Sequence, residues 1–151
     1  MSNLKQTLVD LEHTPGARAT GHMFGNITTD GQVREFKANR LYVAYQQGAL
    51  RFFGAQSEPQ NPDAQTVIEV HLQPESIESG TYRVGSPEVK KIAYVAPDQD
   101  RDSHANSGEV SFNRSTSLAQ IFGAVDAQFE IEGKLISIRC QYDVRGWGKG
   151  I

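Results

Sequence analysis

The chain has 151 residues, of which 38% are hydrophobic, and a formal net charge of −3 at pH 7. That length suits a single domain over residues 1–151 with its own core, and the weak negative charge excludes a general attraction to nucleic acid or to anionic membranes. The single cysteine permits no internal disulfide, no segment has the pattern of a secretory signal or a membrane span, and we therefore expect a cytoplasmic protein.

The N-terminal segment, residues 1–13, predicts one short amphipathic helix. Leu4, Leu8 and Leu11 recur at helical spacing, and Thr14-Pro15-Gly16 ends the pattern. Such a helix would bury its leucine face against the rest of the molecule. We expect it to pack across a sheet or across the open end of one.

Residues 17–46 alternate between polar and apolar side chains, which predicts strands. Asp30-Gly31 is a strong hairpin turn signal. After that turn the apolar positions change from even, as at Phe36, to odd, as at Leu41, so a bulge or break is expected near Asn39-Arg40.

The middle of the chain continues with short strands. Gln47-Gly48 predicts another turn, and the adjacent Phe52 and Phe53 leave the inner face of the next strand undecided. Residues 57–65 contain two prolines and predict a loop. Further strands are predicted at residues 66–73, 80–84, 89–95 and 109–113.

The last long hairpin, residues 124–145, has the clearest pattern in the chain. Apolar and polar residues alternate on both sides of Gly133-Lys134. If Gly133 is the first central residue of a type II′ turn, Ile131 lies opposite Ile136 and apolar side chains meet along the whole hairpin. A slip of one residue would expose that apolar set, so the register is strongly specified.

These elements predict an all-β fold. About eight or nine short strands with regular turn signals are typical of an antiparallel β-sandwich, with a closed β-barrel as the alternative. The unequal strand lengths and two long irregular loops favour the sandwich. Residues 146–151 form a glycine-rich tail.

The second half of the chain resembles a pattern seen in small bacterial β-sandwich domains of unknown function. The resemblance rests on Gly80-Thr81-Tyr82, on Ser-Gly-Glu-Val-Ser-Phe at 107–112, and on Ile121-Phe122-Gly123 leading to Phe129. It covers less than half of the chain. It implies a bacterial β-sandwich and no particular activity.

The polar segment 98–109 has the spacing of an EF-hand calcium loop, with oxygen-bearing side chains at positions 1, 3, 5, 9 and 12. Ser103 stands where the sharp turn of that loop requires glycine, and the flanking segments predict strands rather than helices. The alternative is a solvated connection kept soluble by its charge. The candidate calcium ligands are Asp98, Asp100, Asp102, Asn106 and Glu109.

Aromatic and histidine side chains are the other candidates for contact with a ligand or partner. Phe24 and Tyr42 lie at positions that simple alternation places outside, where aromatic rings stack on sugars or anchor proteins, although core packing is the alternative. His22 and His71 occupy solvent-side positions in different strands, either as independent surface residues or as a pair across a sheet. Trp147 either covers an open end of the fold or contacts another chain.

No hydrolase, phosphate-loop or dinucleotide motif is present, so we assign no catalytic residue. The favoured hypothesis is a non-catalytic module that binds a protein partner or a glycan and dimerises through a sheet edge. The alternatives are a calcium-assisted carbohydrate-binding domain, with calcium as its cofactor, and a small hydrolase. A hydrolase would use the two histidines or surface carboxylates such as Asp126 and Glu130.

Overall fold

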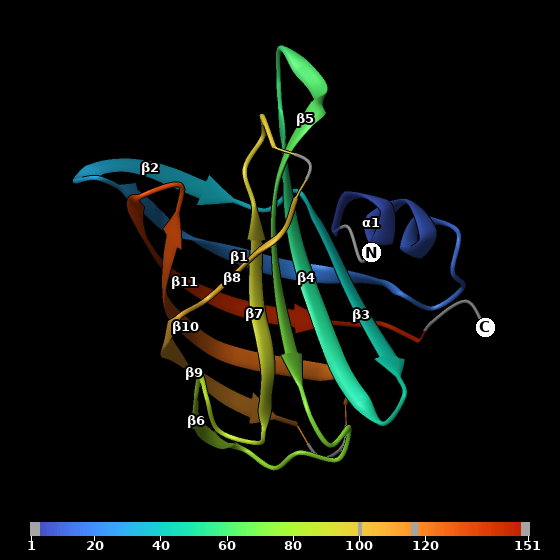
Figure 1. Cartoon of the computed structure of the whole chain (residues 1–151). Helices are drawn as coiled ribbons and strands as arrows, with labels where there is room; N and C mark the ends of the chain where they lie inside the picture. Colours follow the sequence, from blue (N-terminus) through green and yellow to red (C-terminus); the bar gives the residue numbers. More distant parts are fainter. Residues whose placement is uncertain (1–3, 100, 116–117, 149–151) are drawn as a thin grey trace.

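The structure, a computed structural model, describes residues 4–99, 101–115 and 118–148, without the side chains of residues 62 and 63. Within these ranges it is all-β, with eleven strands and one N-terminal helix, α1 (Leu4–Glu12) (Figure 1). The strands are β1 (Arg18–Thr29), β2 (Gln32–Lys37), β3 (Arg40–Gln46), β4 (Ala49–Glu58), β5 (Asn61–Leu72), β6 (Gly80–Arg83), β7 (Val89–Val95), β8 (Ser103–His104), β9 (Ser107–Arg114), β10 (Gln120–Ile131) and β11 (Lys134–Arg145).

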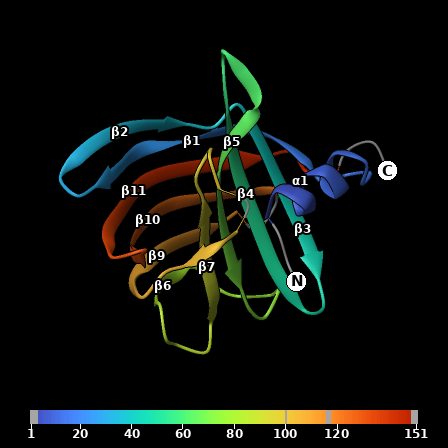
Figure 2. The same cartoon turned by 45° about the horizontal axis from the view of Figure 1, so that its top comes forward.

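The strands form one continuous antiparallel sheet that curls into a half-barrel. Their order is β6-β9-β10-β11-β1-β3-β4-β5-β7-β8, and β2 adds to β1 outside this path. We call β3, β4, β5, β7 and β8 the helix-covered half, and β1, β2, β6, β9, β10 and β11 the open half. The strands of one half run steeply across those of the other (Figures 1 and 2).

Strand β1 joins the two halves, so the expected all-β fold is present as one curled sheet of eleven described strands rather than as a clear two-sheet sandwich of eight or nine. Arg18 and Ala19 pair with β3, while Thr20 and the residues after it pair with β11. At Gly21 an added Cβ atom would lie 2.0 Å from the carbonyl oxygen of Asp143 on β11. Only glycine permits this close approach. Strand β1 can therefore bend from one half into the other, and the two halves remain one continuous sheet.

The main core lies between the two halves. Large side chains from both halves fill it, including Met23, Phe52, Ile68, Phe129 and Tyr142. A second cluster lies outside the helix-covered half, where the leucine face of α1 packs on Tyr42, Phe53, Val67 and Val95. The predicted helix is therefore present, and it buries the outer face of β3, β4, β5 and β7. No helix among the described residues is long and apolar enough to span a membrane.

The last hairpin has its predicted faces but not its predicted register. Glu132 and Gly133 occupy the turn with φ angles of 52° and 79°, a pair of positive values typical of a type I′ turn. Ile131 therefore lies opposite Lys134, and Phe129 lies opposite Ile136. Pairing shifts by two residues relative to the expected register, which keeps the same side chains inside.

The earlier turns follow the sequence more closely. Asp30 and Gln47 have positive φ angles of 47° and 54° in the predicted hairpin turns, and the chain breaks between β2 and β3 as expected. The predicted loop at residues 57–65 is wrong, because β4 and β5 continue to pair through most of it. A register shift between Ser57 and Glu58 accommodates the irregular sequence there.

Candidate ligand-binding site

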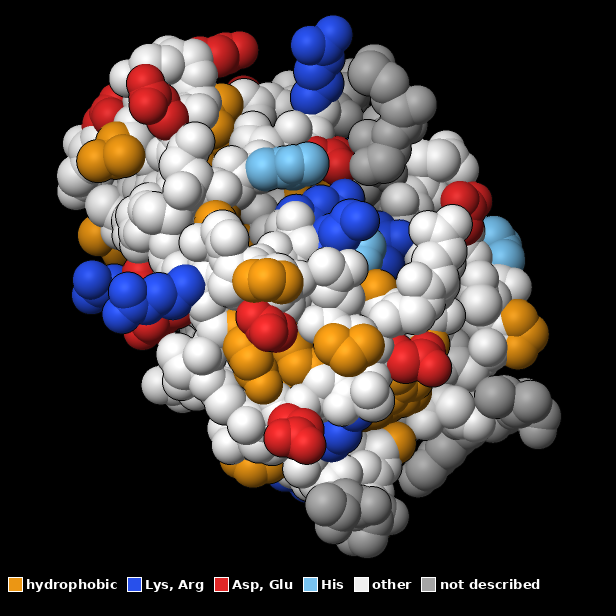
Figure 3. Space-filling model, turned by 60° about the horizontal axis from the view of Figure 1, so that its bottom comes forward, with side chains coloured by type: hydrophobic (Ala, Val, Ile, Leu, Met, Phe, Trp, Pro, Cys, Tyr) orange, Lys and Arg blue, Asp and Glu red, His pale blue; other side chains and the backbone are white. Residues whose placement is uncertain are grey.

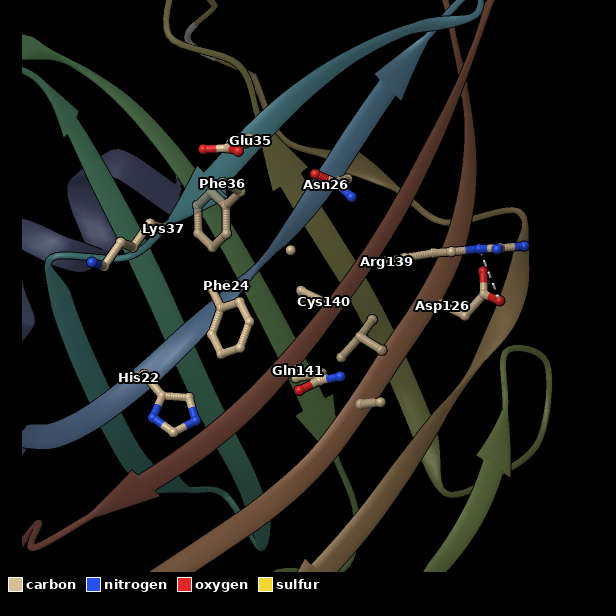
Figure 4. Close-up of a pocket in the computed structure, with 13 residues that line it drawn as sticks. His22, Phe24, Asn26, Glu35, Phe36, Lys37, Asp126, Arg139, Cys140 and Gln141 are labelled. Carbon is tan, nitrogen blue, oxygen red and sulfur yellow. Dashed lines mark ion pairs between the residues drawn. The ribbon is translucent and has the colours of Figure 1, made fainter.

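A groove of about 990 Å³ lies on the outer face of the open half, between β2 and β10 (Figure 4). Alternation along the strands sends every second side chain of this half toward solvent. Side chains of both polar and aromatic type line the groove, namely His22, Phe24, Asn26, Glu35, Lys37, Asp126, Arg139 and Gln141, together with Ala124.

The register of four strands places these side chains in two rows. In the first row Phe24 on β1 lies opposite Lys37 on one side and Gln141 on the other, and Ala124 follows next to Gln141. Alanine is the smallest side chain of this row, so it leaves space on the sheet surface beside Gln141. The second row runs Glu35, Asn26, Arg139, Asp126 in the same strand order.

Phe24 provides the aromatic surface of the groove. Its side chain is 43% exposed, although a phenyl ring is usually buried. The ring of His22 packs against it with 5.3 Å between centroids, and the two rings lie next to each other in Figure 4. The ring is therefore held in place while one part of it faces solvent.

The charged groups of the groove balance one another. Arg139 Nε lies 3.5 Å from Asp126 Oδ2, and Gln128 Nε2 donates a hydrogen bond of 2.7 Å to the other carboxylate oxygen. Glu35 and Lys37 add one charge of each sign. With His22 uncharged the formal charge of the groove is zero, so it has no built-in preference for an acidic or a basic ligand.

Tyr42, which the alternation places outside, is buried beneath α1 instead. Its side chain is fully covered, and its hydroxyl donates a hydrogen bond to Glu12 at the end of the helix. Burial is the main cause that raises the Tyr42 pKa to about 12, and the Glu12 carboxylate adds to it. Tyr42 thus anchors the helix, and it has no surface left for a ligand.

Trp147 lies at the end of β11, half-buried against the main core. The next residue, Gly148, donates a backbone hydrogen bond of 2.7 Å to Gly16. This position corresponds to the alternative in which the tryptophan covers an end of the fold. Residues 149–151 of the predicted glycine-rich tail lie outside the described residues.

His22 and His71 do not meet. His22 alternates with the core residue Met23 and points outward from the open half, whereas His71 alternates with the core residue Val70 on β5. The two rings therefore lie on opposite outer faces with the core between them. Cys140 is buried, and burial raises its pKa to about 12, so it remains a thiol rather than a nucleophilic thiolate at neutral pH.

The acidic segment does not assemble a metal site among the described residues. Asp102 Oδ1 accepts the Leu4 amide hydrogen at the start of α1, at 2.8 Å, while Asn106 Oδ1 accepts the Glu130 amide hydrogen at 2.8 Å. Glu109 lies within β9, opposite Asp126. Asp98 lies before β8 without joining a group of metal ligands, and Asp100 lies outside the described residues.

The pairing of β8 with β7 explains why this loop is extended rather than curled. Ser103 and His104 pair with Tyr94 and Ala93, which draws the segment along the sheet. A calcium loop needs its alternate side chains to converge on one centre. In the described part of the chain, no group of three or more His, Cys, Asp or Glu side chains has that arrangement.

Sequence reasoning selected His22 and Phe24, and Asp126 as a surface carboxylate, but it did not place Asn26, Glu35, Lys37 and Gln141 beside them. Two signals contain that information. The Asp30-Gly31 turn fixes the pairing of β1 with β2, which places Glu35 and Lys37 opposite Asn26 and Phe24. The second signal is the true turn of the last hairpin, which places Arg139 opposite Asp126.

No protein-family model, no curated protein and no solved structure matches the chain. The resemblance to small bacterial β-sandwich domains therefore stays a prediction.

Proposed function

We propose that this protein is a non-catalytic binding module and that its groove holds a neutral glycan. The observation that carries the proposal is the exposed ring of Phe24, held by His22 and flanked by hydrogen-bonding side chains in an open groove. A sugar ring has an apolar C–H face and a polar hydroxyl edge. Phe24 complements the face, and its neighbours complement the edge.

The two side-chain rows supply the polar contacts. Asn26 and Gln141 each carry an amide that both donates and accepts, which suits hydroxyl groups. Arg139 and Asp126 hold each other in position, so a ligand meets a donor and an acceptor that are already oriented. Each such hydrogen bond contributes about 1 kcal/mol net. Several of them, together with the aromatic contact, are needed for useful affinity.

The charge balance favours a neutral glycan over an acidic one. An acidic sugar would be repelled by Asp126 and Glu35 as well as attracted by the two basic side chains, so its charge would add little to the binding free energy. The shape also suits an extended chain, since the groove is open to solvent and spans four neighbouring strands. No step of covalent chemistry is part of this proposal.

The test is calorimetric titration with a panel of neutral oligosaccharides: cellohexaose, maltohexaose, chitohexaose, xylohexaose and mannohexaose. At least one should bind, and Phe24→Ala should weaken it by about tenfold or more, equivalent to ~1.4 kcal/mol. Phe122→Ala is the matched control, because Phe122 is 41% exposed on the same half but lies outside the groove. Absence of binding by every sugar, or equal binding by the Phe24 variant, would refute the proposal.

A second candidate function is pairing through the free edge of β2. Within the described sheet β2 pairs only with β1, and Val33 on it is 66% exposed. A second copy of the chain could add its own strand there. Light scattering over a range of concentrations tests this: Val33→Lys should abolish a dimer, and a monomer at every concentration would rule the dimer out.

A further inference from the structure

Glu69 is a fully buried carboxylate on the outer face of the helix-covered half. On β5 it lies opposite Phe53 on one side and Ala93 on the other, both fully buried. Transfer of an ionised carboxylate out of water costs several kcal/mol unless cations and hydrogen bonds replace the water. The ionised form of Glu69 therefore depends on the cations and hydrogen-bond donors around it.

Three basic side chains surround this carboxylate. Arg51 Nε lies 2.5 Å from Oε2, Lys91 Nζ lies 3.5 Å from Oε1, and His71 Nδ1 lies 3.7 Å from Oε2. Arg51 on β4 is directly opposite His71 on β5, which is directly opposite Lys91 on β7. We call these three residues the basic row. It lies on the face opposite to the glycan groove.

The basic row carries one positive charge more than Glu69 neutralises. Arg51 and Lys91 are cations, while burial lowers the His71 pKa to about 4 and keeps its ring neutral at pH 7. The three side chains are only 14–16% exposed. Because water screens a partly buried charge less than a surface charge, the excess attracts an anion more strongly there.

Several polar atoms of the cluster have no hydrogen-bond partner within the described structure. Arg51 uses Nε on Glu69 and Nη1 on Gln46, with 2.7 Å to Gln46 Oε1. Among the described residues, Glu69 Oε1 and His71 Nδ1 are buried without a hydrogen-bond partner, and Lys91 Nζ lies 3.5 Å from Oε1 as an ion pair. Buried polar groups are usually satisfied, so the hydrogen bonds within the cluster leave part of its polar surface for a further partner.

We propose that the basic row binds a small tetrahedral oxyanion, either free phosphate or the phosphate group of a small molecule. Arg51 and Lys91 would donate to its oxygens, since guanidinium and ammonium groups form the strongest hydrogen bonds to such anions. Glu69 pairs with both cations on the outer face of the sheet, with Arg51 from β4 and Lys91 from β7. The space-filling view shows a face on which lysine and arginine side chains gather around a histidine (Figure 3).

The position of His71 couples this site to a proton. Besides the main effect of burial, its pKa is raised by the charge of Glu69 on its own strand and lowered by those of Arg51 on β4 and of Lys91 and Lys90 on β7. An oxyanion offsets the cations, so a proton binds His71 more readily. The protonated ring then donates Nδ1–H toward Glu69 Oε2 and Nε2–H toward the anion, so both ring nitrogens gain a partner. Anion affinity should therefore increase as the pH falls.

The test is titration with sodium sulfate, whose charge stays constant over the pH range used, against sodium chloride at equal ionic strength. We expect Lys91→Gln to weaken sulfate binding by about tenfold. Lys90→Gln, the same charge change on the exposed neighbouring residue, should weaken it less than about threefold. Equal weakening in both variants, or no sulfate effect beyond that of chloride, would overturn the proposal.

Wild-type protein gives an independent readout in case Lys91→Gln fails to fold. The NMR signals of the His71 ring should move on addition of sulfate, more at about pH 6 than at about pH 8. Unmoved signals would overturn the proposal. Inorganic phosphate and glycerol phosphate distinguish the two sources: tighter glycerol phosphate binding indicates a phosphorylated small molecule, and tighter inorganic phosphate binding indicates the free ion.

Discussion

The two outer faces of the half-barrel are formed by similar alternating strands, but one face is buried under a helix and the other is exposed to solvent. On the helix-covered half, α1 buries Tyr42 and Phe53, and even the charged Glu69 lies out of water. On the open half nothing among the described residues covers β1, β10 and β11, so Phe24 and Arg139 stay exposed. The helix thus makes much of one outer face part of the core, whereas the outer face that carries the groove remains open to solvent.

The largest expected difference between the faces concerns two phenylalanines. Phe53→Ala should lower the free energy of unfolding by about 3–5 kcal/mol, because it leaves a cavity under α1. Phe24→Ala should change it by less than about 1 kcal/mol. Urea unfolding of both variants measures this, and similar losses would show that the groove is part of the core.

The two carboxylates should differ in the same direction. Glu69→Gln removes the charge that neutralises two partly buried cations, and we expect a loss of about 3 kcal/mol. Asp126→Asn affects an ion pair whose members are 43% and 77% exposed, so the loss should stay below about 1 kcal/mol. Urea unfolding at neutral pH is again the measurement. An unchanged free energy of unfolding in Glu69→Gln would mean that the buried charge is dispensable.

Stability should depend on pH through His71. Burial lowers its pKa from the usual 6.5 to about 4 in the folded protein, so the unfolded chain binds more protons between these two values. Stability is then complete above pH 6.5 and falls toward pH 4, by at most about 3 kcal/mol. His71→Gln should flatten this part of the profile. An unchanged profile in the variant would assign the acid sensitivity to other groups.

A smaller effect is expected where α1 is anchored. Tyr42→Phe removes the hydroxyl that donates to Glu12, while Arg18 and Arg40 still contact that carboxylate. We expect a loss of about 1 kcal/mol in thermal or urea unfolding. A loss several times larger would indicate that the helix depends on this hydrogen bond rather than on its leucines.

Calcium should have the smallest effect. A ligand at about a hundred times its dissociation constant adds ~2.7 kcal/mol to stability, which a melting curve detects readily. Because Asp102, Asn106 and Glu109 point to different elements, millimolar calcium and a chelator should give the same midpoint. A rise in calcium that Glu109→Ala abolishes would restore the metal hypothesis.

The sequence predicted the strands and most turns because these depend on local patterns. It did not predict the register of the last hairpin, since the turn uses a positive φ at Glu132, a residue that rarely adopts one. It also left the adjacent Phe52 and Phe53 undecided. Their resolution is that both faces of β4 are buried, one by the main core and one by α1.

The candidate site was predictable only in part, for the same reason. His22 and Phe24 follow from alternation within one strand, whereas Arg139 and Gln141 join them through pairing across strands. Tyr42 was expected to face solvent, because a strand pattern does not reveal which face a helix covers. The leucines of α1 cover Tyr42 on β3, a contact that no pattern within β3 itself indicates.

The most direct test of the account is an NMR map of the neutral oligosaccharide that binds best. We predict that amide signals shift on β1 around Phe24 and on β11 around Arg139 and Gln141, and stay constant on β4, β5 and β7. Shifts confined to the helix-covered half would contradict the assignment of binding to the open half.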